Sequence, residues 1–348
     1  MDSIKAILSK SFIKIVLVIL EILLVMSLIG VTTGYHEVLE KQEIQMSLEQ
    51  EPQNVKTYNN SNLTDVNYST GMNELIQCYR KNNDNLDDKI QEKIRELNSL
   101  YHQSSLYHSF LYQDIYSGFT VSYNEDTPIF TASTIKAPAM IYLMEKASSG
   151  EINLDESLTY TSNFYSGGSG VLKNKVQNTS YQVRTLIKYA ITESDNIAYN
   201  MLMTRYGKDN VLNFWSPKGT KYIFTLDTIW GVTSAHDASI YMNELYNFYL
   251  NNDTYGKELM DYFKGATWKL ITGKNKEFDI ANKGGWSGSA IHDVAIVFDR
   301  NPYILIIMSN TGNSDYMTLF NKTSKIISEL HQLYWIQKER ECSSIKQY

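Results

Sequence analysis

The feature that most restricts the fold is the placement of strand-like segments at both ends of the region that can fold. Two such segments occur early, at residues 105–115 and 119–123, and three occur late, at 278–283, 293–298 and 303–308. Short apolar runs bounded by Gly, Pro or Asn are typical of strands. Because helical patterns separate the two groups, we expect an α+β fold with one antiparallel sheet assembled from both chain ends, plus a mostly helical subdomain.

Helical periodicity marks the segments around these strands. Leu86, Ile90, Ile94 and Leu97 recur at helical spacing before the first strand. Gly207 is expected to end the helix that precedes it. The other predicted helices cover residues 133–145, 183–191, 197–206, 234–250 and 317–334.

An apolar run near the N-terminus predicts a membrane anchor. Residues 15–31 are apolar apart from Glu21, Ser27 and Gly30, and lysines precede the run but do not directly follow it. A helix over this run would be about 25 Å long, enough to cross a bilayer core with slight adjustment. The lysines place the N-terminus inside. We therefore expect a cytoplasmic segment 1–14, a transmembrane anchor 15–34 and an extracytoplasmic remainder at the cell membrane.

A cleaved signal peptide is the alternative to a retained anchor. The residues after the run offer no A-x-A-like cleavage site, and no cysteine at its end could carry a lipid. Residues 35–85 are polar and rich in Asn, Glu and Gln, which predicts a stalk with some helical character. The folded domain is expected to cover residues 86–340.

Charge and cysteine content narrow the partners. The chain of 348 residues has a net charge of −6 and no Lys/Arg stripe, which argues against nucleic acid. Its two cysteines, Cys78 and Cys342, flank the predicted domain. In an exported protein they could form a disulfide, or they could be two unpaired thiols outside the core. No His/Cys/Asp/Glu cluster has metal-ligand spacing.

Ser133-Thr134-Ile135-Lys136 is the first of three short motifs that suggest chemistry. A serine hydroxyl is a poor nucleophile until a neighbouring group takes its proton, and positions i and i+3 share one face of a helix. Lys136 could be that base if burial or a second cation, such as Lys283, lowered its pKa. Ser133 would lie at a helix N-terminus, which favours an oxyanion. Alone, the motif would be read as an ordinary helix start.

Ser194-Asp195-Asn196 and Lys283-Gly284-Gly285 are the other two motifs. Alone, each has a plain structural explanation: a polar helix C-terminus for the first, and a strand running into a glycine turn for the second. Asp195 could brace its turn through hydrogen bonds. A strand of small residues lets a substrate backbone lie alongside it, and Lys283 supplies a cation for a carboxylate.

The three motifs together, in this order, resemble the signature of class A β-lactamases and penicillin-binding proteins. The separations of about 60 and about 90 residues and the element order over residues 86–336 are also similar to those of this family. The resemblance implies a serine hydrolase without a cofactor that acts on β-lactams or on D-Ala-D-Ala-type peptidoglycan stem peptides. The implied site residues are Ser133, Lys136 and Ser194 for catalysis, and Asn196, Lys283, Gly285 and Trp286 for substrate binding.

The resemblance also implies a role for each of these residues. Ser133 would form the acyl-enzyme, and Ser194 would relay a proton to the leaving nitrogen. Asn196 would bind the substrate amide, and Lys283 its carboxylate. The N–H of Trp286 would join that of Ser133 in the oxyanion hole.

Two departures from the family pattern affect the expected activity. Gly284 stands where the family usually has Thr or Ser, so a hydroxyl that contacts the carboxylate is missing. The loop that holds the deacylating glutamate in class A enzymes is also missing, since no Glu lies between Glu193 and Glu244. Asp227 is the carboxylate nearest this junction, and we expect a structural role for it. Acylation with slow deacylation is therefore favoured over efficient β-lactam destruction.

Alternatives to an enzyme stay open at this point. The same cleft could serve a non-catalytic module that binds or senses β-lactams or cell-wall peptides, and a degenerate scaffold is the third possibility. His292 and Asp293 are expected to have turn or pairing roles. Residues 166–170, Ser-Gly-Gly-Ser-Gly, could form a mobile loop beside the cleft or a simple connector.

Overall fold

The computed structural model describes residues 54–59, 70–81, 85–104, 107–223, 229–252, 254–271, 278–288, 290–310 and 316–343. The predicted anchor, most of the predicted stalk and Asp227 lie outside these residues. Within the described ranges, no helix combines the length and the hydrophobicity that a bilayer crossing requires.

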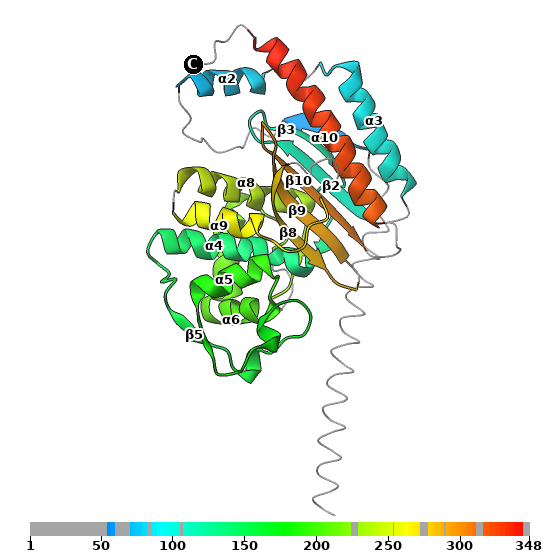
Figure 1. Ribbon diagram of the computed structural model, residues 1–348. Helices are drawn as coiled ribbons and strands as arrows, with labels where there is room; N and C mark the ends of the chain where they lie inside the picture. Colours follow the sequence, from blue (N-terminus) through cyan, green and yellow to red (C-terminus); the bar gives the residue numbers. More distant parts are fainter. Residues whose placement is uncertain are drawn as a thin grey trace, which may run out of the picture. The chain divides into compact units, whose positions relative to one another are not determined.

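A six-stranded antiparallel sheet runs through the middle of the described fold (Figure 1). Its strand order is β1-β3-β2-β10-β9-β8. The strands are β1 (Lys56–Asn59), β2 (His108–Asp114), β3 (Phe119–Tyr123), β8 (Asp279–Trp286), β9 (Ala290–Phe298) and β10 (Tyr303–Asn310). The early strand β2 pairs with the late strand β10, with Leu111 opposite Ile306. This pairing confirms the predicted sheet built from both chain ends.

Both faces of β10 are buried. Leu305 and Ile307 belong to one hydrophobic cluster, whereas Ile304 and Ile306 belong to the other. Successive side chains of a strand point to opposite faces of the sheet. The unbroken apolar run of β10 is thus explained by a helical layer on each side of it.

Three helices contribute to the cluster on the first face, and in Figure 1 α3 and α10 lie together over the sheet. They are α2 (Thr70–Arg80), α3 (Asp88–Gln103) and α10 (Tyr316–Glu341). A disulfide joins Cys78 of α2 to Cys342, just beyond α10. Both β1 and α2 fall within residues 35–85, so these parts of the predicted stalk belong to the folded domain instead. The polar sequence of β1 explains the error, because this edge strand is largely exposed.

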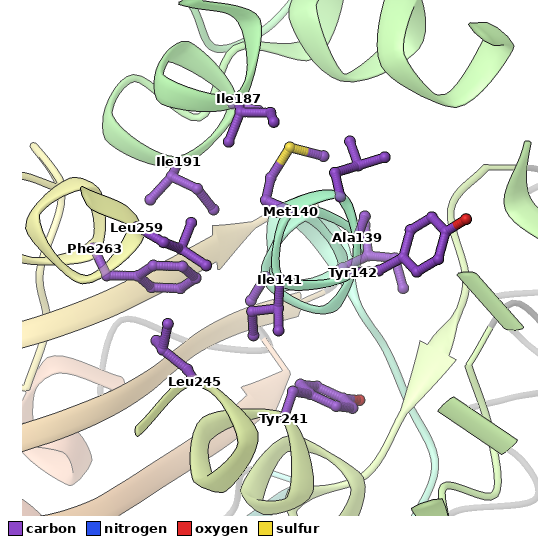
Figure 2. Close-up of a cluster of buried hydrophobic side chains, with 14 of the residues drawn as sticks. Ala139, Met140, Ile141, Tyr142, Ile187, Ile191, Tyr241, Leu245, Leu259 and Phe263 are labelled. Atoms are coloured by element: carbon purple, nitrogen blue, oxygen red, sulfur yellow. The ribbon is translucent and has the colours of Figure 1, made fainter. Parts of the chain in front are cut away.

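The second face carries the helical subdomain, which is organised around α4 (Lys136–Ser148). Figure 2 shows Met140, Ile141 and their neighbours on α4 surrounded by apolar side chains from other helices. Pro138 lies in the first turn of α4, where its missing N–H costs no hydrogen bond, and its carbonyl accepts from Trp215 Nε1 at 3.0 Å. The surrounding helices are α5 (Val183–Thr192), α6 (Asn196–Tyr206), α7 (Lys208–Trp215), α8 (Ala235–Asn251) and α9 (Tyr255–Lys264).

Short elements connect these helices. Two small antiparallel ladders pair β4 (Ile129–Phe130) with β7 (Val232–Thr233), and β5 (Ser157–Thr159) with β6 (Ser180–Gln182). The 3₁₀ turns are η1 (Ala132–Ile135), η2 (Ser162–Phe164), η3 (Leu172–Asn174) and η4 (Ser216–Lys218). The turn η1 leads directly into α4, so the helix predicted from residue 133 begins with a 3₁₀ segment.

Candidate active site

Ser133 and Lys136 lie side by side at the start of the central helix. The η1 turn places Lys136 Nζ 3.1 Å from Ser133 Oγ. Lys136 is fully buried. Its Nζ donates to the Ser194 carbonyl and to Asn196 Oδ1, each at 2.6 Å, and it lies 3.3 Å from Ser194 Oγ. The first two predicted motifs thus meet at one amine.

Burial lowers the pKa of Lys136 well below its ordinary value, and the positive charge of Lys283 lowers it further, whereas Asp195 opposes the shift. A neutral amine has two N–H donors and one lone pair. The two short contacts to Ser194 and Asn196 use both donors. The lone pair is then free to accept the hydroxyl proton of Ser133, which is the requirement for a general base.

Lys283 enters the same group from strand β8. Its Nζ donates to Ser194 Oγ at 2.9 Å and to the Gly284 carbonyl at 2.7 Å. Burial lowers the pKa of Lys283 to about 7, while the nearby Asp293 carboxylate opposes this shift. Ser194 Oγ therefore lies between two amines, a geometry that allows it to pass a proton from one side of the cleft to the other.

Asp195 fixes the backbone of the second motif. Its Oδ1 accepts the N–H groups of Ile197 and Ala198, both at 2.9 Å, and so caps α6. Its Oδ2 accepts the N–H of Leu172 at 2.7 Å. Ser194, next to it, has a positive φ of 51°. The bracing role predicted for Asp195 agrees with these bonds, which hold Ser194 in an unfavourable backbone conformation.

The glycine-serine loop of residues 166–170 is hydrogen-bonded to the second motif. Asn196 Nδ2 donates to the Gly167 carbonyl at 2.8 Å, and Asn196 N donates to the Ser169 carbonyl at 3.2 Å. Gly170 packs so closely on Asp195 that a Cβ there would lie 2.4 Å from its carboxylate. The loop therefore forms one rim of the cleft.

Strand β8 passes close to the nucleophile. A Cβ on Gly285 would lie 3.0 Å from Ser133 N and 2.9 Å from Thr134 N, so only glycine allows this approach. The strand continues through Trp286 instead of ending in a glycine turn after Lys283. Trp286 is 68% exposed at the end of the strand.

A cavity of about 250 Å³ opens at this convergence. The predicted residues Ser133, Ser194, Lys283 and Trp286 line it. Lys136, Asn196 and Gly285 are not among its lining residues. The remaining lining residues are Ser169, Ile191, Thr192, Glu193, Ala266, Thr267, Trp268 and Gly284.

Two aromatic rings lie near the amine of Lys136, and they were not predicted from the sequence. Lys136 Nζ is 5.4 Å from the centre of the Trp230 ring and 5.9 Å from that of Tyr199. Tyr199 Oη donates to the Ile229 carbonyl at 2.6 Å. In the sequence both residues look like core positions, because nothing in their spacing relates them to the lysine.

His292 and Asp293 lie inside β9, not at its start, and are fully buried. Nε2 of His292 lies 2.7 Å from the Phe130 carbonyl, and burial lowers the pKa of this imidazole to about 4. Asp293 Oδ2 accepts the N–H groups of Leu270 and Ile271 at 2.7 and 2.9 Å. These bonds are structural, as expected from the sequence.

A sequence model described as the beta-lactamase enzyme family matches residues 89–332. The chain belongs to this family. The matched residues include all three motifs and most of the described fold. Among proteins with curated descriptions, none matches its sequence significantly.

Solved structures with the same fold include PBP-A and several β-lactamases. PBP-A, in the acyl-enzyme complex of a mutant with penicillin G, is 21% identical with a TM-score of 0.63, over 70% of this chain and 96% of that one. A beta-lactamase from Sphaerobacter thermophilus is 15% identical with a TM-score of 0.59, over 70% and 96%. At these identities the similarity shows the fold alone. This is the α+β, β-lactamase-like fold predicted from the sequence.

Proposed function

We propose that the protein is a serine acyl-enzyme that reacts with β-lactams and D-Ala-D-Ala-type peptides and deacylates slowly. The observation that supports it most is the hydrogen-bonded chain from Ser133 through Lys136 and Ser194 to Lys283. A nucleophile, a buried amine with a lowered pKa and a proton relay are the groups that acyl transfer to serine requires.

The acylation step uses these groups in turn. Lys136 takes the hydroxyl proton of Ser133, whose Oγ forms a bond to the carbonyl carbon of the substrate. The carbon–nitrogen bond of the lactam or peptide then breaks, and the proton reaches the leaving nitrogen through Ser194. Lys283 holds the carboxylate of the substrate. Backbone N–H groups of Ser133 and Trp286 receive the oxyanion.

The slow second step follows from the surroundings of Lys136. Hydrolysis needs a base that activates water against the acyl-serine. Within the described part of the chain, Asp195 is the carboxylate that acts electrostatically on Lys136, and its oxygens already accept three backbone N–H groups. The rings of Trp230 and Tyr199 occupy another side of the amine. Among the described residues, Glu193 is the carboxylate that lines the cleft, and it is not one of the charges that act on Lys136.

We also propose that the domain is held at the outer face of the cell membrane. The apolar run of residues 15–31 and the lysines before it support this location. The D-Ala-D-Ala-type peptides named above belong to the cell wall, so an enzyme that acts on them must face that side of the membrane.

Intact-mass spectrometry after addition of benzylpenicillin tests acylation and its lifetime together. We expect one covalent adduct per molecule, and its loss over hours instead of seconds. Ser133→Ala should give no adduct. Lys136→Ala should slow adduct formation about 10²–10⁴-fold, the usual effect of removing a general base.

A folded domain that forms no adduct would overturn the proposal, and non-covalent retention of penicillin would then favour a binding module. Rapid loss of the adduct would overturn slow deacylation alone. Circular dichroism of each variant is the control for folding. Ile336→Ala is a suitable matched surface variant, since this side chain is 61% exposed on α10.

A further inference from the structure

A tryptophan ring fills the space that a side chain on the middle residue of the β8 motif would take. A Cβ on Gly284 would lie 2.1 Å from Trp268 Cε3 and 2.5 Å from Cζ3. Gly284 is not among the glycines with positive φ. The ring of Trp268, and not the backbone conformation, is therefore what requires glycine at this position.

The backbone of this tryptophan is held on both sides. The N–H and the hydroxyl of Thr267 both donate to the Thr192 carbonyl, at 3.0 and 2.9 Å. Asn282 Nδ2 donates to the carbonyl of Trp268 at 3.0 Å. These bonds connect the backbone of the segment to the end of α5 and to β8, and the ring itself packs against Gly284.

The ring of Trp268 borders the part of the cleft where the carboxylate of a substrate would lie. Trp268 is 38% exposed and lines the same cavity as Lys283, Ser194 and Trp286. Because side chains alternate along a strand, positions 284 and 286 share one face of β8, opposite to Lys283. Lys283 and Trp268 nevertheless line one cavity, so a carboxylate bound there by Lys283 would lie in a cleft that has an aromatic ring as one wall and no hydroxyl at position 284.

We propose that Trp268 is a specificity-determining residue that selects acyl donors whose leaving group has an aromatic or bulky apolar substituent beside its carboxylate. This inference rests on the proposed acyl-enzyme function. Contact with such a substituent removes apolar surface of the ring from water and adds ring–ring attraction. A leaving group without a side chain makes neither contact, and it also lacks the hydroxyl partner that Thr or Ser would provide.

Two esters with the same acyl group test the selection: hippuryl-3-phenyllactate and hippuryl-glycolate. In both, Ser133 Oγ bonds to the hippuryl carbonyl, the ester carbon–oxygen bond breaks and the released hydroxy acid takes the proton. Water then frees hippuric acid and restores Ser133. We expect wild-type kcat/KM to be roughly tenfold or more higher for the phenyllactate ester, as apolar pocket contacts usually give.

Variants separate the effect of ring contact from the intrinsic reactivity of the two esters, because that reactivity is the same whichever variant is used. Trp268→Ala should reduce the ratio between the two esters to near that of the esters themselves in water, whereas Trp268→Phe should keep most of it. Ile336→Ala should leave the ratio unchanged. An unchanged ratio in a folded Trp268→Ala would overturn the inference.

A double variant tests the contact between the two residues. Gly284→Thr alone should displace the ring, which lowers both the ester preference and the melting temperature. Trp268→Ala together with Gly284→Thr should recover much of the melting temperature, because the threonine then has room. Strictly additive effects would mean that the ring and position 284 do not compete for the same space.

Binding to Ser133→Ala distinguishes this inference from the proposed function. Titration calorimetry with 3-phenyllactate and with lactate needs no covalent step. Tighter binding of 3-phenyllactate that disappears on adding Trp268→Ala would support the selection even if the wild type formed no acyl-enzyme. Equal binding of the two acids, with normal acylation of the wild type, would overturn the selection and leave the proposed function intact.

Discussion

The role proposed for Lys283 depends on its protonation state. It must be charged to attract a carboxylate, yet burial lowers its pKa to about 7. Since a lysine loses its charge as the pH rises through its pKa, the charged fraction falls about tenfold per pH unit above that value. We predict that the second-order rate constant for acylation by benzylpenicillin declines above about pH 7, because this constant reports the free enzyme.

Lys283→Arg is the control for this prediction. A guanidinium stays charged throughout the range, so the decline above neutral pH should disappear, even if the absolute rate is lower. The measurement is the rate of adduct formation at low penicillin concentration between pH 6 and 9. A wild-type profile that is flat across this range would contradict the assigned pKa.

Residue-level prediction from the sequence succeeded where a motif specified both residue types and spacing. Ser133 and Lys136 meet because one helical turn separates them. The family resemblance predicted that Ser194 and Lys283 would join them, and both do. The contact of Trp268 with Gly284 could not be predicted, because 16 positions separate two residues that meet only after β8 folds back against α9. The missing hydroxyl at Gly284 was the only signal.

Asp195 connects two elements, and its removal should affect both. Asp195→Ala removes the N-cap of α6 and leaves the buried N–H of Leu172 without its acceptor. We predict a loss of about 2–4 kcal/mol in the free energy of unfolding, from about 1 for a cap and 1–3 for the unpaired donor. Acylation should slow as well, because the carbonyl and hydroxyl of Ser194 lose their fixed position.

Ser234→Ala is the matched comparison for this loss. Ser234 caps α8 through the bond from the N–H of Asp237 to its Oγ, at 3.1 Å. Its loss should cost only about 1 kcal/mol. Urea denaturation of the two variants gives both values. Equal losses would show that the bond to Leu172 contributes nothing.

Elements with strong apolar patterns were predicted well, and those without them were not. Residues 119–123 form β3 as expected, and Gly207 ends α6. By contrast, β1 has no apolar alternation, because it is an edge strand that pairs on one side only. The short ladders β4–β7 and β5–β6 are two or three residues long, which is below what periodicity can detect.

At the scale of the whole molecule, the disulfide is the feature with the largest expected effect on stability. Cys78 and Cys342 are 264 positions apart, and cross-links that close long loops restrict the unfolded chain most. Cys78→Ser with Cys342→Ser should lower the free energy of unfolding by about 3–5 kcal/mol. Acylation of the folded variant should be unchanged, since these residues belong to the cluster opposite α4. Loss of acylation without unfolding would contradict this.

The overall architecture was accessible from the sequence because element order alone requires the two chain ends to meet in the sheet. The disulfide was one of two alternatives for Cys78 and Cys342, and only the folded chain, in which α2 reaches the end of α10, decides between them. The boundary of the domain was also missed, since β1 and α2 precede the predicted start at residue 86.

The disulfide between Cys78 and Cys342 closes the chain between them into a covalent ring. A protease that nicks one surface loop anywhere between the two sulfurs opens the backbone but releases no fragment. The two pieces would separate in electrophoresis only after reduction, and a nicked molecule would keep every group of the cleft on a single connected body. At the proposed location outside the cell, cleavage of this kind by an extracellular protease need not mean loss of activity.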